Sequence, residues 1–425
     1  MGHVRRSAHA GEPRGDERVR GLPRAFWLLL AGTLVNRLGT FVVPFLVLYL
    51  TAERGLSVPA AGAMLTLLGA GALLASWAGG VLADRVGRRV TLSGAMGSAA
   101  VAMLALGAAR GTWQIALATF LVGFTGELFR PASQALIADV VTPAERARAY
   151  GLLFWAVNLG WAIATTTAGL LARHGYWLLF LGDALTSLVF GMLVWRGLSE
   201  PPRAAPVRGS TRGGFATALR DRPFLAFTGL QFLFACVLFQ IFSTVPLAMQ
   251  ADGLSPAAFG VAVAVNGLLI VAMQPVLTPL LTRLPRSPTM AFSQLALGLG
   301  LGSVAFASTL PGYALTLALA TFGEIGVATV ALAVVAEFAP ADVRGRYFGA
   351  FGLAAGTAAM VGPAVGAAVF AWYGGGAVFA GCAGLGVVMC VGQLLLSPAI
   401  SRRVASVAGS LPLTPEIAGV SARCP

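Results

Sequence analysis

Five ionisable side chains lie inside long apolar stretches of the sequence, where a charge is costly unless it faces protein or water. They are Arg37, Glu127, Arg130, Asp183 and Glu324. A carboxylate in such surroundings takes up or releases a proton as nearby charges and burial change. We expect Glu127 and Glu324 to carry protons or bind cations, and Arg37 and Arg130 to tune them or bind anionic substrate groups. A permanent ion pair between helices is the alternative, and Asp183 is expected to be structural.

The densest group of polar side chains lies between residues 112 and 138. Glu127 and Arg130 are three residues apart and share a helix face with Gln134. Pro131 has no N–H, so the carbonyl of Glu127 loses its helix bond and becomes a free acceptor. Polar residues also recur in three other apolar stretches, and we expect them to line a cavity together with Gln134: Thr33, Asn36, Gln240 and Thr321.

The elements that carry these residues are apolar segments of membrane-crossing length. Of the 425 residues, 57% are hydrophobic and only 11% are charged, whereas a soluble domain carries about 25% charged residues. Runs of about 20 apolar residues indicate transmembrane helices, so we predict an all-α integral membrane protein. The twelve expected helices lie at 25–50, 58–82, 90–109, 112–138, 149–172, 176–196, 223–249, 256–282, 289–309, 312–337, 347–372 and 375–397.

Polar segments divide the chain into five parts. An Arg-rich tail at 1–24 precedes a six-helix bundle at 25–196. A linker rich in Arg, Pro and Gly at 197–222 leads to a second six-helix bundle at 223–397, and a second tail follows at 398–425.

An internal repeat relates the two bundles. The stretch PAERARAYG at 143–151 is similar to PADVRGRYFG at 340–349, which aligns Arg146 with Arg344 at an offset of 198 residues. Both halves therefore cross the membrane in the same sense. Parallel six-helix repeats are one of the layouts of secondary transporters.

The arginines predict the orientation. All 29 basic residues are Arg, and with the N-terminus in the cytoplasm 24 of them lie on the cytoplasmic side and 3 on the outer side. Cytoplasmic loops carry such an excess, so we expect both termini, the linker and the tails in the cytoplasm. The net charge of +13 is thereby a topology signal, and we do not expect nucleic-acid binding. An arginine-only chain rich in Ala and Gly is typical of a GC-rich bacterial genome.

The loop after the second predicted helix contains GGVLADRVGRR, residues 79–89. It resembles the signature of the major facilitator superfamily at this place, G-x-x-x-D-R-x-G-R-R, and the resemblance covers about residues 25–397. The matching residues are Gly80, Asp84, Arg85, Gly87, Arg88 and Arg89. The resemblance implies a loop that latches the cytoplasmic side in one state of an alternating-access cycle, and helices 1, 4, 7 and 10 around a central cavity. We expect Asp139 and Glu337 to be gate partners of the arginine-bearing loops.

A second pattern, which marks exporters of this superfamily in helix 5, is incomplete here. Ala164 and Thr165 replace its Gly-Pro, and the family's helix 4 arginine is missing near Thr119. The Gly-Pro lies instead in the repeat copy in helix 11. Small residues at such positions pack membrane helices closely, and we expect this of Gly151, Gly160, Gly169, Gly349, Gly362, Pro363 and Gly366.

These features predict a secondary active transporter that resembles the drug:proton antiporter branch of the superfamily. We expect proton-coupled export of small molecules, drug-like compounds or metabolites, by alternating access. Proton-coupled uptake of a small metabolite is the alternative, and a sensor built on a transporter scaffold is a hypothesis of another class.

We expect neither enzymatic activity nor a cofactor, with the proton gradient as the energy source. No nucleophile and base are grouped, and without Lys the chain has no Walker phosphate loop. The four cysteines form no metal or disulfide pattern. The expected partners are a small-molecule substrate, protons and the lipid bilayer, for a monomer in a bacterial cytoplasmic membrane.

Overall fold

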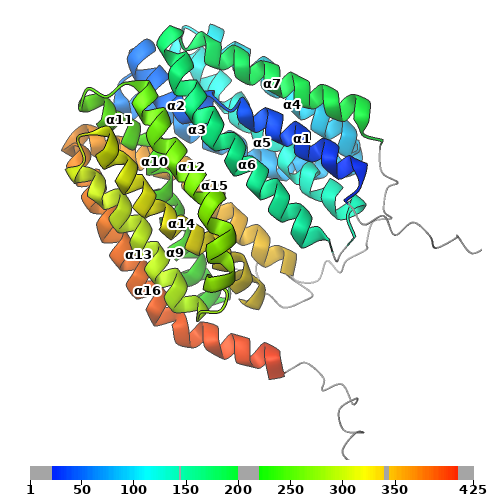
Figure 1. Ribbon diagram of the computed structural model, residues 1–425, viewed down its shortest axis with the longest axis vertical. Helices are drawn as coiled ribbons and strands as arrows, with labels where there is room; N and C mark the ends of the chain where they lie inside the picture. Colours follow the sequence, from blue (N-terminus) through cyan, green and yellow to red (C-terminus); the bar gives the residue numbers. More distant parts are fainter. Residues whose placement is uncertain (1–21, 143–144, 200–219, 339–343, 410–425) are drawn as a thin grey trace, which may run out of the picture.

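The computed structural model describes residues 22–142, 145–199, 220–338 and 344–409, and it confirms the predicted all-α fold (Figure 1). Twelve helical segments of these residues are long and apolar enough to cross a membrane. The first half contains α1 (Arg24–Leu38), α2 (Val42–Leu48), α3 (Val58–Arg85), α4 (Arg88–Ala108), α5 (Thr112–Val140), α6 (Arg146–Leu171) and α7 (Trp177–Gly197). The second half contains α9 (Arg222–Leu238), α10 (Gln240–Ser243), α11 (Val245–Ala251), α12 (Pro256–Leu281), α13 (Arg286–Gly302), α14 (Leu310–Phe338), α15 (Arg344–Tyr373) and α16 (Gly375–Gly409).

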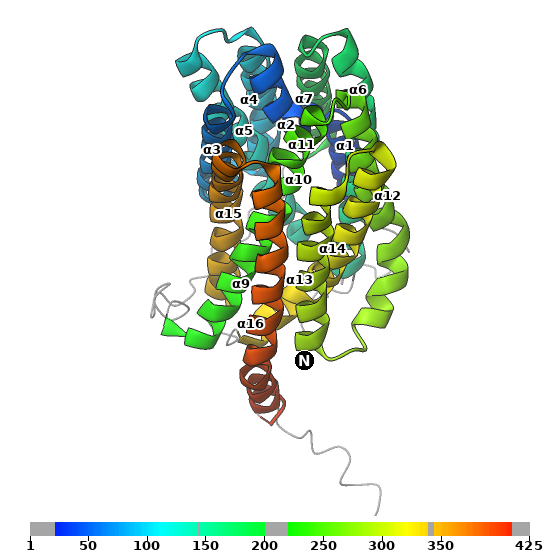
Figure 2. The ribbon, with the colours of Figure 1, turned by 90° about the vertical axis from the view of Figure 1, so that its left-hand side faces the viewer.

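The two halves form separate helix bundles that meet along two helix pairs. Helix α3 packs beside α15, as Figure 2 shows, and α6 packs beside α12. Helix α16 continues to Gly409, past the predicted end of the last helix at residue 397.

The halves pack closely from the middle of the bundle to the end away from the arginine-rich loops. A Cβ on Gly69, near the middle of α3, would lie 2.7 Å from the Cα of Met360, and one on Gly260 of α12 would lie 2.4 Å from the carbonyl oxygen of Thr165. Glycine allows backbones to approach this closely in membrane helices. Nearer the arginine-rich loops, a Cβ on Gly151 would meet nothing within 4 Å.

Two of the predicted helices are interrupted. The segment predicted at 25–50 breaks between α1 and α2, and the segment at 223–249 breaks between α9 and α10. Helix α2 begins at Val42 and α10 begins at Gln240, two positions that the repeat offset of 198 residues aligns. A break frees backbone groups that need new partners inside a membrane, and each half supplies them differently.

In the first half the partner is Asp183 of α7. Asp183 is 4% exposed, and its carboxylate lies beside the backbone N–H groups of Phe41 and Val42. In the second half the Gln240 amide donates to the Gly362 carbonyl at 2.9 Å and accepts from the hydroxyl of Ser243 at 3.0 Å.

Candidate functional site

The first group of the candidate site is an ion pair on α5. Arg130 Nη1 lies 3.3 Å from Glu127 Oε2, and the two side chains are 60% and 29% exposed. The pair joins residues of one helix, three positions apart, as the spacing predicts. An exposed pair of this kind contributes little to stability, about 0.2–1 kcal/mol.

Helix α5 has two exposed faces of opposite character. Leu117 and Leu121 are exposed on one face, while Arg130 and Gln134 are exposed on another face with Glu127. At 3.6 residues per turn, the two faces are more than a third of a turn apart. The leucine face suits lipid, whereas an exposed arginine inside the membrane requires water or protein. The Arg130 face is therefore not suited to contact lipid.

Arg37 of α1 packs against α5 near the ion pair. Its guanidinium carbon is 5.6 Å from the centroid of the Phe129 ring, and its Nε is buried with no hydrogen-bond partner. The charges of Glu127 and Asp183 are close enough to act on it. Gly160 of α6 packs on the same residue, since a Cβ there would lie 2.6 Å from the Arg37 Cβ. Arg37 is thus a helix-packing residue as well as a cation beside the site.

The second group of the candidate site surrounds Glu324 on α14. Asn266 of α12 donates through Nδ2 to Glu324 Oε2 at 2.8 Å and to Thr321 Oγ1 at 2.9 Å. The Thr321 hydroxyl donates to the carbonyl of Leu317 at 2.7 Å. Within the described parts of the chain, no arginine or histidine lies within ion-pair distance of Glu324. This carboxylate therefore has only neutral partners.

Sequence reasoning missed Asn266, although an amide in the middle of the apolar segment 256–282 is itself a signal. Asn266 is 4% exposed and 58 residues from Glu324, so no local spacing connects the two. Buried polar groups in a membrane need a partner, and that rule would have placed Asn266 opposite another polar residue.

Helix α14, like α5, has two exposed faces, but both of its faces carry mainly apolar residues. Leu315 and Leu319 are exposed on one face, and Ala328 and Leu332 are exposed on the face of Glu324. By the repeat offset of 198 residues, Ala328 corresponds to Arg130. The face of α5 that carries Glu127 is thus polar, whereas the face of α14 that carries Glu324 is largely apolar.

Four residues that were expected to line a cavity are buried in helix packing instead. Thr33 is 2% exposed, Asn36 is 8%, Gln240 is 5% and Thr321 is 0%. Asn36 donates to Ser187 Oγ of α7 at 3.0 Å. Gln240 forms the hydrogen bonds described above at the break between α9 and α10. Of the expected lining residues, Gln134 is the exposed one.

The residues of the expected latch make contacts within their own half. Arg88 Nε lies 3.0 Å from Asp139 Oδ2, and Arg286 pairs with Glu337 at the corresponding place in the second half. These pairs tie the start of α4 to α5 and the start of α13 to α14. The expected gate partners Asp139 and Glu337 therefore face arginines, at positions that the repeat aligns.

The remaining latch residues lie around the turn between α3 and α4. Gly87 has φ 105°, a conformation that favours glycine, and it precedes α4 directly. Arg89 donates to the Trp195 carbonyl at the end of α7 and lies over that indole ring at 4.5 Å. Arg85 is exposed, and the side-chain positions of Gly80 and Asp84 lie outside the described residues.

The small residues expected to pack helices lie at several interfaces. A Cβ on Gly169 would lie 2.9 Å from the Cα of Ala257 in the other half. Cβ atoms on Gly362 and Gly366 would meet Cys236 at 3.0 Å and Gln240 at 2.0 Å within the second half. Gly349 and Pro363 lie on α15 with them, and a Cβ on Gly62 of α3 would lie 3.5 Å from the Pro363 carbonyl oxygen.

Residues 29–255 and 232–417 both match the Major Facilitator Superfamily. The chain belongs to this superfamily. The membership confirms the resemblance carried by the loop at 79–89 and identifies the protein as a multi-pass membrane transporter of the superfamily, within which its relatives include an antiporter and multidrug resistance proteins.

Among characterised relatives, the chain is 27% identical over 373 residues to a Na(+), Li(+), K(+)/H(+) antiporter of Planococcus maritimus, covering 80% of this chain and 87% of that protein. It is 26% identical over 284 residues to the multidrug resistance protein MdtH of Yersinia enterocolitica, covering 66% of this chain and 70% of that protein.

Solved structures show the same fold. The nucleoside transporter NupG matches with a TM-score of 0.73 over 90% of this chain and 100% of that one, at 12% identity. A D-xylose–proton symporter matches with a TM-score of 0.66 over 87% of this chain and 96% of that one, at 16% identity. These similarities concern the fold, and the substrate has to be argued from the site.

Proposed function

We propose that this transporter exports small amphipathic molecules in exchange for protons. The observation that carries the proposal is the contrast between the two carboxylates inside the membrane. Glu324 has neutral partners, so it can hold or release a proton without breaking an ion pair, whereas Glu127 is already paired with Arg130. Glu324 is therefore the proton carrier in this proposal.

The faces of α5 and α14 that carry Glu127 and Glu324 support an amphipathic substrate. Arg130 and Gln134 offer charge and hydrogen bonds on α5, and Ala328 and Leu332 offer an apolar surface on α14. A molecule with one polar and one apolar side would satisfy both faces at once. In this proposal Glu127, Arg130 and Arg37 hold its polar side.

The position of the close helix contacts supports a state open to the cytoplasm. The halves pack closely from the middle of the bundle to the end away from the arginine-rich loops, and the arginine excess assigns those loops to the cytoplasm. Both termini are cytoplasmic in this arrangement. Substrate would enter from the cytoplasm and leave after the contacts at Gly69 and Gly260 separate.

The test measures intracellular accumulation of fluorescent dyes and antibiotics in a bacterium that lacks its own pumps, with and without a protonophore. We expect the wild type to lower accumulation and the protonophore to abolish the effect. Glu324→Gln should remove export, and Glu127→Gln should weaken it. Glu53→Gln, at the end of the molecule away from the arginine-rich loops, is the control and should leave export unchanged.

Other outcomes of this experiment would overturn parts of the proposal. If the wild type raises accumulation of a compound, the direction is wrong and uptake takes its place. If Glu324→Gln exports as well as the wild type at equal expression, Glu324 does not carry the proton.

A monovalent cation is the second candidate for the exported species. The similarity to a Na(+), Li(+), K(+)/H(+) antiporter favours it, as does the group of side-chain oxygens on Glu324, Asn266 and Thr321. Everted membrane vesicles with a preset pH gradient separate the candidates, because NaCl or KCl would dissipate the gradient for a cation antiporter and amphipathic dyes would not.

A further inference from the structure

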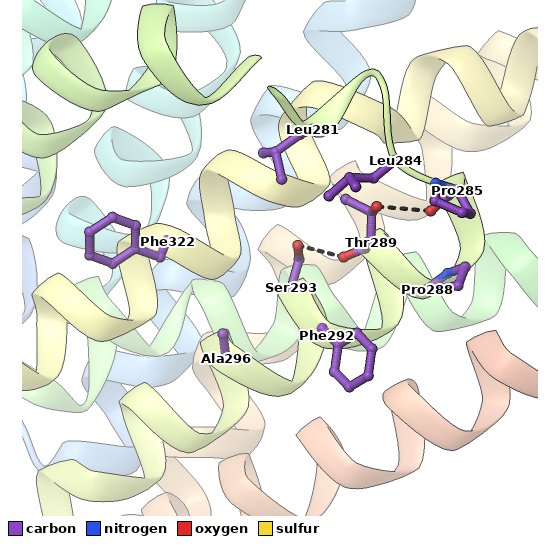
Figure 3. Close-up of a pocket in the computed structure, with 9 residues that line it drawn as sticks. All are labelled: Leu281, Leu284, Pro285, Pro288, Thr289, Phe292, Ser293, Ala296 and Phe322. Atoms are coloured by element: carbon purple, nitrogen blue, oxygen red, sulfur yellow. Dashed lines mark hydrogen bonds between the residues drawn. The ribbon is translucent and has the colours of Figure 1, made fainter. Parts of the chain in front are cut away.

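The second half has an open groove that the transport site does not use. It has a volume of about 400 Å³, within the range of small-ligand pockets. Figure 3 shows its walls, which come from three helices: Leu281 of α12, Phe292 and Ala296 of α13, and Phe322 of α14, with Leu284 from the connecting turn.

The groove presents an apolar surface. Its two hydroxyl groups are turned into α13, because Thr289 Oγ1 donates to the Pro285 carbonyl at 2.8 Å and Ser293 Oγ donates to the Thr289 carbonyl at 2.7 Å (Figure 3). Phe292 remains 62% exposed and Leu284 47%. An occupant would therefore meet hydrocarbon along the length of the groove.

The groove opens toward lipid and not toward the space between the halves. Phe322 is 44% exposed on the same face of α14 as Leu315 and Leu319. That face is on the other side of the helix from Glu324 and Ala328. In a membrane the occupant is then a lipid, and the remaining question is its headgroup.

The turn that borders the groove contains an arginine with no ion-pair partner among the described residues. Arg283 is exposed in the turn between α12 and α13, between the lining residues Leu281 and Leu284. No carboxylate of the described chain lies within ion-pair distance of Arg283, whereas the neighbouring Arg286 is paired with Glu337. Basic pockets between membrane helices at the cytoplasmic surface bind anionic lipid headgroups.

We propose that the groove formed by α12, α13 and α14 binds an anionic phospholipid, with an acyl chain against Phe292 and Phe322 and the phosphate paired with Arg283. The site is independent of the transport cycle proposed above. Its ligand is a membrane component with a negative headgroup, and a zwitterionic lipid of the same chain length would fill the groove without the ion pair.

The test uses the full chain in detergent and native mass spectrometry, with titration of dioleoyl phosphatidylglycerol and dioleoyl phosphatidylcholine. We expect phosphatidylglycerol to bind more tightly by about fivefold, the effect of one arginine near a membrane surface. Arg283→Gln should remove this preference, and Arg222→Gln, a cytoplasmic-end arginine on α9, should retain it.

A second variant tests the acyl-chain part of the site. Ala296→Leu fills the groove without changing a charge and should weaken the binding of both lipids. The proposal is overturned if the wild type binds the two lipids equally, if Arg283→Gln keeps the preference, or if Ala296→Leu binds both as the wild type does. Unchanged elution of each variant as a monodisperse protein excludes misfolding as the cause.

Discussion

The two halves of the transporter share a sequence repeat, yet their carboxylates have different partners. On α5, Glu127 is paired at 3.3 Å with Arg130 of its own helix. On α14, Glu324 is bound at 2.8 Å by the neutral Asn266 of another helix. Arg130 corresponds to Ala328 by the repeat, so the second half lacks the cation at the matching position.

This difference shows how the two halves of a repeat fold can acquire different roles. Protonating a carboxylate that is paired with a cation would break the ion pair. A carboxylate with neutral partners is free to change its charge. In the proposed mechanism the first half binds a polar group and the second carries a proton.

The largest effect is expected from giving the second half the cation that it lacks. Ala328→Arg places a guanidinium four residues after Glu324 on the same exposed face, where an i,i+4 pair forms. The ionised carboxylate would then be stabilised, and we expect proton-driven transport to fall by about tenfold or more. Transport into everted vesicles with a preset pH gradient measures it.

Ala328→Gln is the control for this change, since it adds bulk at the same position without a charge. Equal transport by Ala328→Arg and the wild type would show that Glu324 does not need neutral surroundings, and the comparison between the halves would fail.

A smaller effect is expected from removing the neutral partner of Glu324. Asn266→Leu deletes a hydrogen bond to an ionisable group, which contributes about 1.5–3 kcal/mol. We expect transport to fall by about tenfold, with the pH dependence of the rate displaced, as measured in the same vesicles. Asn158→Leu on α6 is the matched control, because the Asn158 amide donates to the Phe154 carbonyl of its own helix at 2.9 Å. If Asn266→Leu leaves the pH dependence of the transport rate unchanged, Asn266 has no role at Glu324.

The smallest effect is expected from opening the ion pair of the first half. Arg130→Gln removes a side chain that is 60% exposed, so we expect the free energy of unfolding to change by less than about 1 kcal/mol. Thermal unfolding of the purified protein measures this. If the pair also holds the polar side of a substrate, the KM for transport rises while the maximal rate is kept. A drop in unfolding temperature as large as that of a core substitution would instead make the pair structural.

Much of the site on α5 was predictable, because its partners are local. The pairing of Glu127 with Arg130 and the shared face with Gln134 follow from helix geometry alone. The site on α14 was predictable only in part: Glu324 was identified by its rarity in an apolar segment, but Asn266 was not. Thr33, Asn36, Gln240 and Thr321 are expected from the sequence to face a cavity, whereas in this structure they are buried.

The sequence by itself determined the twelve membrane segments, the repeat and the loop at 79–89 that places the chain in its superfamily. Hydropathy and motif spacing are properties of residues that are neighbours in the chain, so they can be read from the sequence alone. Only the tertiary structure decided that Asp183 meets the break before Val42, that Asn266 meets Glu324, and that the halves pack closely from the middle of the bundle to one end. Those contacts depend on how whole helices cross and rotate against each other, which no single helix specifies.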